Sequence, residues 1–273
     1  MRTLVRPRHA ESGLAEPPLF DFFANTHPLP ECFALLRRLE WSIHNSAHIT
    51  LGVNSLCEVL AHTPRLEYLQ LEGSPHNSLL PLARMHLPTL RTLHVVRANF
   101  VLTSRIARWD LPALAHVVVE VGSHVATLQP LWDAFGRQLR SAELGAHLGF
   151  RMSDYVTLLL ATCALDELAL HVHFVGTPPK PLDSATLRQV HWHARPNSAA
   201  AGTPDAHVAD HVHWLCGARR VPELASLVLH GDWAGLLQSA RLCEYFEFLQ
   251  ERRPGLRIEW PNGHLVFPAP PSA

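Results

Sequence analysis

Apolar residues recur along this chain in a short pattern that begins with proline, Pro-x-Leu-x-x-Leu-x-Leu. The clearest copy runs from Pro64 to Leu71, and similar copies begin at Pro88, Pro112 and Pro222. Proline disfavours helix and favours an extended chain, and the two apolar residues at the end of each copy share one face of a strand. A strand this short cannot bury its apolar face alone, so we expect successive copies to stack side by side.

Looser copies of the pattern fill the intervals between the clear ones. They begin at Leu36, Leu139, Leu165, Leu187 and Leu256. From first leucine to first leucine the intervals are 30, 24, 24, 25, 26, 22, 37 and 32 residues. Most lie in or near the range of leucine-rich repeats, roughly 20 to 29 residues. The expected fold is therefore α/β, an irregular leucine-rich-repeat solenoid with a curved parallel sheet and with helices and loops on its convex side.

Between the expected strands, the apolar spacing changes toward the helical period. Four helices are predicted: one capped by Asn54, one over 128–135, one over 154–162, and one over 233–252 capped by Asp232. The segments 76–86 and 100–110 are less regular, and we expect single turns there. The longest prediction, over 233–252, rests on a capping residue followed by an apolar stripe.

The pattern predicts one continuous domain with two short ends. Residues 1–30 are expected to form a mobile N-terminal segment, 31–263 a leucine-rich-repeat-like domain, and 264–273 a proline-rich C-terminal tail. Chain ends without apolar pattern are commonly poorly ordered. We find no composition typical of an interdomain linker.

The segment Leu87-Pro88-Thr89-Leu90-Arg91-Thr92-Leu93-His94-Val95 resembles the leucine-rich repeats of fungal, basidiomycete-type F-box-like proteins. The resemblance covers the chain from about Leu36 to Trp260. It implies a substrate-receptor subunit of a cullin-type ubiquitin ligase, in which an F-box would hold a ligase adaptor and the repeats would hold the target. No F-box module is recognisable ahead of the repeats, and only residues 29–36 faintly resemble its opening.

Composition limits the classes of partner. With 47% hydrophobic and 17% charged residues, the chain has the material for a folded core. Its formal net charge of -1 argues against binding nucleic acid, which requires an excess of lysine and arginine. No apolar run approaches the roughly 20 residues that cross a bilayer, so we expect no membrane partner. The five cysteines have no regular spacing, which favours reduced thiols and a cytoplasmic or nuclear monomer.

Twenty histidines raise the question of a metal site. The pairs that would share one side of a strand or helix are His171 and His173, His191 and His193, and His207 and His211. No matching second cluster and no His-Glu-x-x-His motif accompanies them, so we expect no metal ligand and no cofactor, with a zinc site as the open alternative. No nucleophile motif or phosphate-binding loop is present either, so we expect no catalytic residue. An enzyme of unknown class stays a remote alternative.

If the leucines point inward, the residues beside them face the concave side of the sheet. These candidate protein-binding residues are Arg38, Glu40, Tyr68, Gln70, Glu72, Thr92, His94, His116, Glu120, Glu143, Glu167, His171, Gln189, His191, His193 and His230. A mixed polar surface with an aromatic ring suits protein recognition. We therefore expect a non-catalytic interaction scaffold that binds a protein on this face. The alternatives are a solvated sheet face and the ligase receptor, whose further partner would be a ubiquitin-ligase adaptor.

Overall fold

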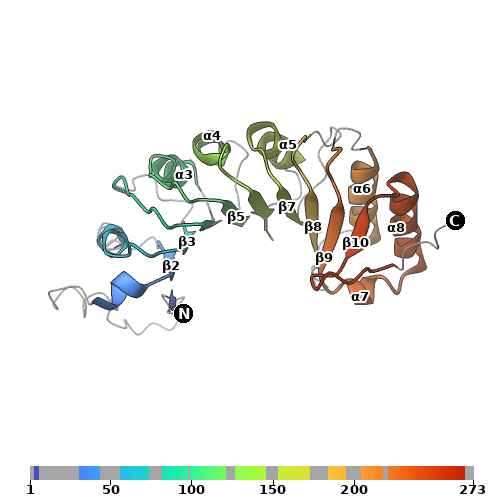
Figure 1. Cartoon of the computed structure of the whole chain (residues 1–273), viewed down its shortest axis with the longest axis horizontal. Helices are drawn as coiled ribbons and strands as arrows, with labels where there is room; N and C mark the ends of the chain where they lie inside the picture. Colours follow the sequence, from blue (N-terminus) through green and yellow to red (C-terminus); the bar gives the residue numbers. More distant parts are fainter. Residues whose placement is uncertain are drawn as a thin grey trace.

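A computed structural model of the chain describes residues 3–5, 31–43, 56–73, 82–97, 99–120, 127–145, 153–172, 184–194, 204–217 and 221–267. Within these residues, the strands form one sheet of 10 parallel strands whose spatial order follows the chain from β1 to β10. Figure 1 shows the sheet as the inner side of an arc, with the helices along its outer side. The α/β class and the stacking of consecutive repeats are as predicted.

The strands are β1 (Thr3–Val5), β2 (Arg38–Ser42), β3 (Tyr68–Glu72), β4 (Thr92–Val96), β5 (His116–Glu120), β6 (Ser141–Leu144), β7 (Glu167–His171), β8 (Gln189–Ala194), β9 (Ser226–Gly231) and β10 (Arg257–Glu259). The helices are the 3-10 helix η1 (Glu31–Leu35), α3 (Phe100–Ile106), α4 (Gln129–Phe135), α5 (Ser153–Thr162), α6 (Pro204–Gly217), α7 (Trp233–Leu236) and α8 (Ala240–Arg252). Residues 56–61 are helical as well.

The strand phase is the one that the leucine spacing predicts. Neighbouring strands pair without offset, so that Leu39 lies beside Leu69 and Leu69 beside Leu93. The second and fourth residues of every strand from β2 to β9 are at most 2% exposed. These two rows of side chains form a continuous apolar core beneath the helices, and the alternate residues face the concave side.

The proline of each clear copy lies in a tight turn just before the strand begins. The N–H of Leu66 donates to the carbonyl of Thr63 at 3.1 Å, and the same bond joins Leu90 to Leu87 at 3.3 Å. Pro64 therefore occupies the second position of a tight turn, where its fixed φ is favourable. The proline does disfavour helix, as expected, but the chain turns there before it becomes extended.

One backbone carbonyl at the start of each repeat fixes the register of the next repeat. The carbonyl of Arg37 accepts from the N–H groups of both Glu67 and Tyr68, at 2.9 and 3.0 Å. The same double acceptor recurs at Glu67, Arg91, Ala115, Arg140, Asp166 and Arg188. The starts of successive strands are thus aligned whatever the length of the segment that joins them.

The helices agree with the predictions in three places and differ in two others. Helices α4 and α5 and the helical residues 56–61 lie where they were expected. The prediction of single turns over 100–110 is wrong, because α3 forms there and the Asn99 side chain caps it by accepting from the N–H of Leu102 at 2.8 Å. The cap predicted at Asn54 lies outside the described residues, as does most of 76–86.

The single helix predicted over 233–252 is also wrong, since the chain forms α7 and then α8. Asp232 caps α7 as predicted, accepting from the N–H of Gly235 at 3.3 Å. The break lets the rings of Trp233 and Phe246 both reach the core, where their centroids are 5.8 Å apart. Trp192 of β8 stacks on Trp233 in the same cluster at 6.2 Å.

The two ends of the described chain both contact the sheet. Strand β1 pairs with β2, so three residues of the N-terminal segment expected to be mobile belong to the sheet. Leu265 forms an isolated β-bridge with Glu259 of β10, and Phe267 packs against the core. The first residues of the expected C-terminal tail therefore contact the last repeat. Residues 1, 2 and 6–30 of the first segment and residues 268–273 of the second lie outside the described part.

Two further expectations, reduced cysteines and no segment that crosses a membrane, can be compared with the described residues. Cys57, Cys163, Cys216 and Cys243 are free thiols, and burial raises the pKa of Cys163 to about 12. In the described part of the chain, every helix is too short or too polar to cross a bilayer.

Candidate functional site

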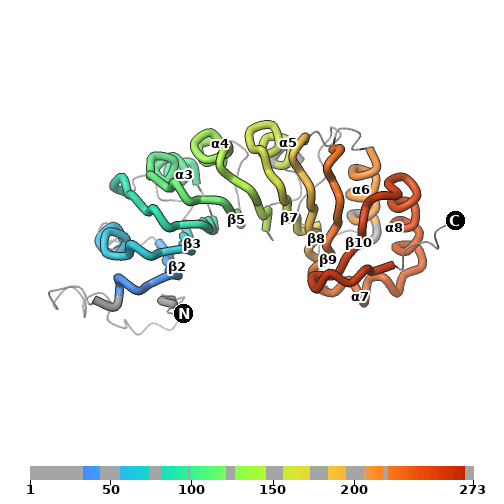
Figure 2. Tube along the Cα trace, in the orientation of Figure 1, coloured from blue at the N-terminus to red at the C-terminus, as the bar shows by residue number. Residues whose placement is uncertain are grey.

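The register arranges the predicted concave residues in three rows that cross the strands. Figure 2 shows that the strands themselves lie along the inner side of the arc. The first strand residues are Arg38, Tyr68, Thr92, His116, Glu167 and Gln189; the third are Glu40, Gln70, His94, Glu143 and His191; the fifth are Glu72, Glu120, His171, His193 and His230. Ser42, Ser141 and Ser226 lie in the same rows and were missed by the sequence analysis. The rows form a mainly polar surface, which Val96, Val118, Ala169 and Val228 interrupt.

Two of the predicted residues are too buried to meet a partner directly. Glu72 is 8% exposed because its carboxylate accepts from Ser42 Oγ at 2.7 Å and lies 3.3 Å from the guanidinium of Arg97. His171 is 5% exposed because neighbouring side chains cover it. Both residues lie on the concave face, but they influence its surface only by positioning the side chains beside them.

In the N-terminal half of the face, Tyr68 contacts several of the surrounding polar side chains. The guanidinium of Arg38 lies 3.7 Å from the centroid of the Tyr68 ring and also pairs with Glu40 at 2.8 Å. The Tyr68 hydroxyl is within hydrogen-bond distance of His94 Nδ1 at 2.8 Å and of Gln70 Oε1 at 3.2 Å. Burial raises the pKa of Tyr68 above its ordinary value. The ring is thereby held in one orientation on a rigid strand.

Histidines dominate the C-terminal half of the face. The rings of His171, His193 and His230, from β7, β8 and β9, stack face to face with centroids 4.6 Å apart at each step. His191 Nδ1 lies 2.9 Å from His230 Nε2. The stack follows directly from the strand register, because the fifth residues of adjacent strands are paired.

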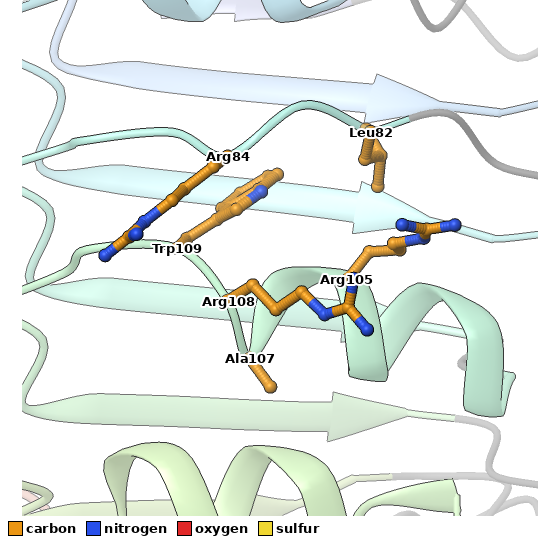
Figure 3. Close-up of a pocket in the computed structure, with 6 residues that line it drawn as sticks. All are labelled: Leu82, Arg84, Arg105, Ala107, Arg108 and Trp109. Atoms are coloured by element: carbon orange, nitrogen blue, oxygen red, sulfur yellow. The ribbon is translucent and has the colours of Figure 1, made fainter.

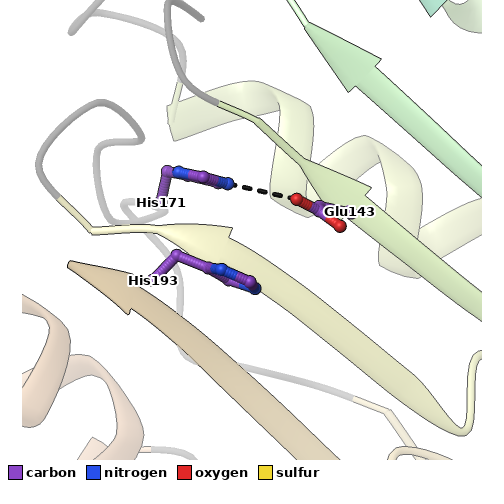
Figure 4. Close-up of side chains that lie close together, drawn as sticks. All are labelled: Glu143, His171 and His193. Atoms are coloured by element: carbon purple, nitrogen blue, oxygen red, sulfur yellow. Dashed lines mark hydrogen bonds and ion pairs between the residues drawn. The ribbon is translucent and has the colours of Figure 1, made fainter. Parts of the chain in front are cut away.

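Glu143 of β6 extends the stack into a three-residue cluster, which we call the Glu–His–His cluster (Glu143, His171 and His193; Figure 4). His171 Nε2 donates to Glu143 Oε1 at 3.1 Å. One nitrogen or oxygen atom from each residue lies within 4.8 Å of the others. Three adjacent strands thus bring two imidazoles and one carboxylate to the same point.

A hollow of about 180 Å³ adjoins the cluster on the concave face. Its walls are His116, Ser141, Ala142, Glu143, Glu167, Ala169, His191, His193 and His230. The small side chain of Ala169, at the third position of β7, leaves the space that the longer polar groups surround. Two members of the cluster, Glu143 and His193, line the hollow directly.

Burial and hydrogen bonding determine which of the side chains that line the hollow carry a charge. The hydrogen bond from His171 lowers the pKa of Glu143 to about 2, although burial opposes the shift. Burial lowers the pKa of both His191 and His193 to about 4, and neighbouring imidazoles add to this effect. At neutral pH these two imidazoles are therefore neutral and Glu143 is ionised.

The sequence analysis anticipated pairs of histidines within one strand or helix, whereas the structure brings histidines together across strands. His173 and the side chain of His207 lie outside the described part, and His211 is buried with its ring edge-on to Trp192 at 5.8 Å. The expectation of no matching second cluster did not take into account that His193 of β8 would pair with His171 of β7. The signal was present in the repeats, since both residues follow the first leucine of their copy by six positions.

A second hollow, of about 520 Å³, lies beside the C-terminal end of α3 (Figure 3). It is lined by Leu82, Arg84, Arg105, Ala107, Arg108 and Trp109, and the indole N–H of Trp109 donates to the carbonyl of Ala83 at 2.9 Å. Its polar side chains are all guanidinium groups. It therefore offers positive charge but none of the mixed donors and acceptors of the concave face.

Comparison with protein-family models and with curated proteins found no match for the chain. Its function is therefore argued from the geometry of the concave face.

Proposed function

We propose that this chain is an irregular leucine-rich-repeat scaffold that binds a protein partner on its concave face without catalysing a reaction. The observation that carries the proposal is the set of three mainly polar rows in register across β2 to β9. Side chains on paired strands keep fixed positions, so such a surface loses little conformational entropy when a partner docks. Concave sheet surfaces of solenoids commonly serve this purpose.

The charge of the face favours a partner with exposed lysine or arginine side chains. The predicted concave residues include the carboxylates Glu40, Glu120, Glu143 and Glu167 against the single guanidinium of Arg38, while the buried carboxylate of Glu72 is paired with Arg97. Burial keeps His191 and His193 neutral at neutral pH, so they do not offset these charges. A surface of this charge repels phosphates and attracts a basic segment of protein.

Tyr68 has the properties of a binding hot spot. Its ring is half-buried, and Arg38, Gln70 and His94 fix its position. Rigid tyrosines at the centre of polar surfaces commonly provide a large share of binding free energy. We therefore expect partner affinity to depend on this ring.

The test is affinity capture with the full chain, followed by measured affinities for the captured partner. We expect Tyr68→Ala to weaken binding by roughly 10- to 100-fold, the effect of losing a hot-spot ring. The matched control is Tyr245→Ala on α8, another half-buried tyrosine near an arginine, Arg241, but on the helical side of the molecule. Tyr245→Ala should bind as wild type, and binding should weaken as salt is raised.

Equal binding by wild type and Tyr68→Ala, with both folded by circular dichroism, would exclude Tyr68 as a contact. Equal loss in Tyr68→Ala and Tyr245→Ala would contradict docking on the concave face. Recovery of a ubiquitin-ligase adaptor with the partner would favour the ligase-receptor hypothesis over a simple scaffold.

A further inference from the structure

The Glu–His–His cluster combines the side chains that bind zinc in proteins. Two imidazoles and one carboxylate come from β6, β7 and β8, whose pairing holds all three on one face of the sheet. Imidazole nitrogens and a carboxylate oxygen suit zinc and related transition metals, whereas magnesium and calcium prefer oxygen ligands alone. We infer that Glu143, His171 and His193 bind one zinc ion, a site independent of whichever protein docks on the concave face.

The distances within the cluster are close to those of a metal site. Two ligand atoms bonded to one tetrahedral zinc at about 2.0 Å lie about 3.3 Å apart. His171 Nε2 and Glu143 Oε1 are already 3.1 Å apart. All three ligand atoms lie within 4.8 Å of one another, so the widest pair has to close by at most roughly 1.5 Å. Rotation of the half-buried side chains of Glu143 and His193 can supply that movement.

The hydrogen bond between His171 and Glu143 marks the position where the cation would sit. Without metal, a proton on His171 Nε2 bridges the nitrogen and the carboxylate oxygen. Zinc would take the place of this proton at Nε2, the proton passing to Nδ1 of the same ring or to solvent, and would in addition draw in His193. The side-chain exposures are 7% for His171 and 25% for Glu143, so the charge of the carboxylate is only partly screened by water. A divalent cation would compensate that charge directly.

Neighbouring groups orient the ligands and leave the site open on one side. His230 stacks on one face of the His193 ring and His171 on the other, at 4.6 Å each, so the ring is confined between two planes. Glu143 and His193 also line the 180 Å³ hollow. Three protein ligands leave one tetrahedral position, which water from this hollow can fill.

Zinc titration of the full-length chain tests the site. The purified protein is first stripped with a chelator and then competes for Zn²⁺ with a chromophoric indicator. We expect one zinc ion per chain at this site, no displacement by excess Mg²⁺, and an increase in melting temperature on adding zinc. Glu143→Gln and His193→Gln should each weaken binding by at least 100-fold, since changes in outer-shell residues alone cost roughly 10- to 100-fold.

The matched control is His213→Gln, which removes an exposed histidine from α6 and should leave zinc affinity unchanged. Cobalt substitution provides an independent readout, because the visible spectrum of Co²⁺ reports the ligand set and should change in Glu143→Gln. Wild-type affinity in both cluster variants, with folding confirmed by circular dichroism, would overturn the inference. Equal losses in His213→Gln, or no zinc binding by wild type, would overturn it as well.

Discussion

The imidazole of His191 lies among ionisable groups from several strands of the concave face. His230 of β9 is its hydrogen-bond neighbour at 2.9 Å, Glu167 of β7 is 3.9 Å away, and Glu143 and His116 act on it from further along the sheet. Burial is nevertheless the largest influence on the pKa of His191, and it lowers that pKa to about 4. At neutral pH, the imidazole of His191 is therefore uncharged in the folded protein.

This burial predicts that the protein loses stability as the solution is acidified. Because the pKa of His191 falls from 6.5 in the unfolded chain to about 4 in the folded one, the unfolded chain binds more protons between these values. The free energy of unfolding is then highest above pH 6.5 and decreases toward pH 4, by about 1 kcal/mol from this residue at pH 5.5, allowing for partial solvent screening. Urea unfolding at pH 7.5 and 5.5, in the presence of a chelator, measures the change.

His191→Gln should lose less stability than wild type over this pH interval, whereas His62→Gln, which removes an exposed histidine, should behave as wild type. The same acid-induced loss in all three proteins would show that His191 is not responsible.

Sequence reasoning identified the concave residues one by one but could not identify the contact among Glu143, His171 and His193. Alternation along a strand fixes which face a residue occupies, and that much is local. The contact depends on three strands separated by intervals of 26 and 22 residues being aligned, and on the side-chain rotamers there. The equal offset of His171 and His193 from the first leucine of their copies indicates the alignment of two of the strands, but the rotamers that bring Glu143 to them are not encoded in a short segment of sequence.

Among the elements, the end of β9 leaves the backbone little freedom at Gly231. Gly231 has a φ of 93°, and a Cβ there would lie 2.1 Å from the carbonyl oxygen of Ala194 on β8. Gly231→Ala should lower the free energy of unfolding by about 2 to 3 kcal/mol, because the φ is unfavourable for alanine and the backbone has to move. Chemical denaturation measures this directly.

Gly255→Ala is the control for that substitution, since a Cβ at Gly255 meets nothing within 4 Å. Its effect should stay within about 0.5 kcal/mol, as is usual for unconstrained surface positions. Comparable midpoints for Gly231→Ala and wild type would mean that β9 ends differently from the structure described above.

The elements also show where pattern reasoning fails. The strands were predicted because the repeated leucines recur with a two-residue spacing. Helix α3 was missed because its stripe is short, although Asn99 provided a capping signal. The division between α7 and α8 could not be predicted, since it arises when Trp233 and Phe246 both pack against Trp192, which is 41 and 54 residues earlier in the chain.

In the whole molecule, stability should vary along the stack because each repeat contacts only its neighbours. Strands β4 to β8 are paired on both sides, whereas β1 and β10 lie at the ends of the described sheet. We expect backbone amides in β4 to β8 to exchange with deuterium at least about tenfold more slowly than those in β1 and β10. Hydrogen exchange read by mass spectrometry tests this, and uniform protection from β1 to β10 would indicate a single cooperative unit.

The order of the strands could be predicted at this scale, because consecutive repeats stack in sequence. The irregular helical side could not, because the connecting segments differ in length and composition from one repeat to the next. The interval from Leu187 to Leu224 is 37 residues and includes the 14-residue helix α6, yet β8 and β9 still pair without offset.

The carbonyl of Arg188, which accepts from the N–H groups of both Ala225 and Ser226, explains how that alignment survives. Insertions and deletions between repeats are absorbed on the outer curve of the arc, so evolution can vary that side while the inner face keeps its geometry. For protein engineers, the same property makes the segments between β8 and β9 suitable places to graft a foreign loop or a reporter.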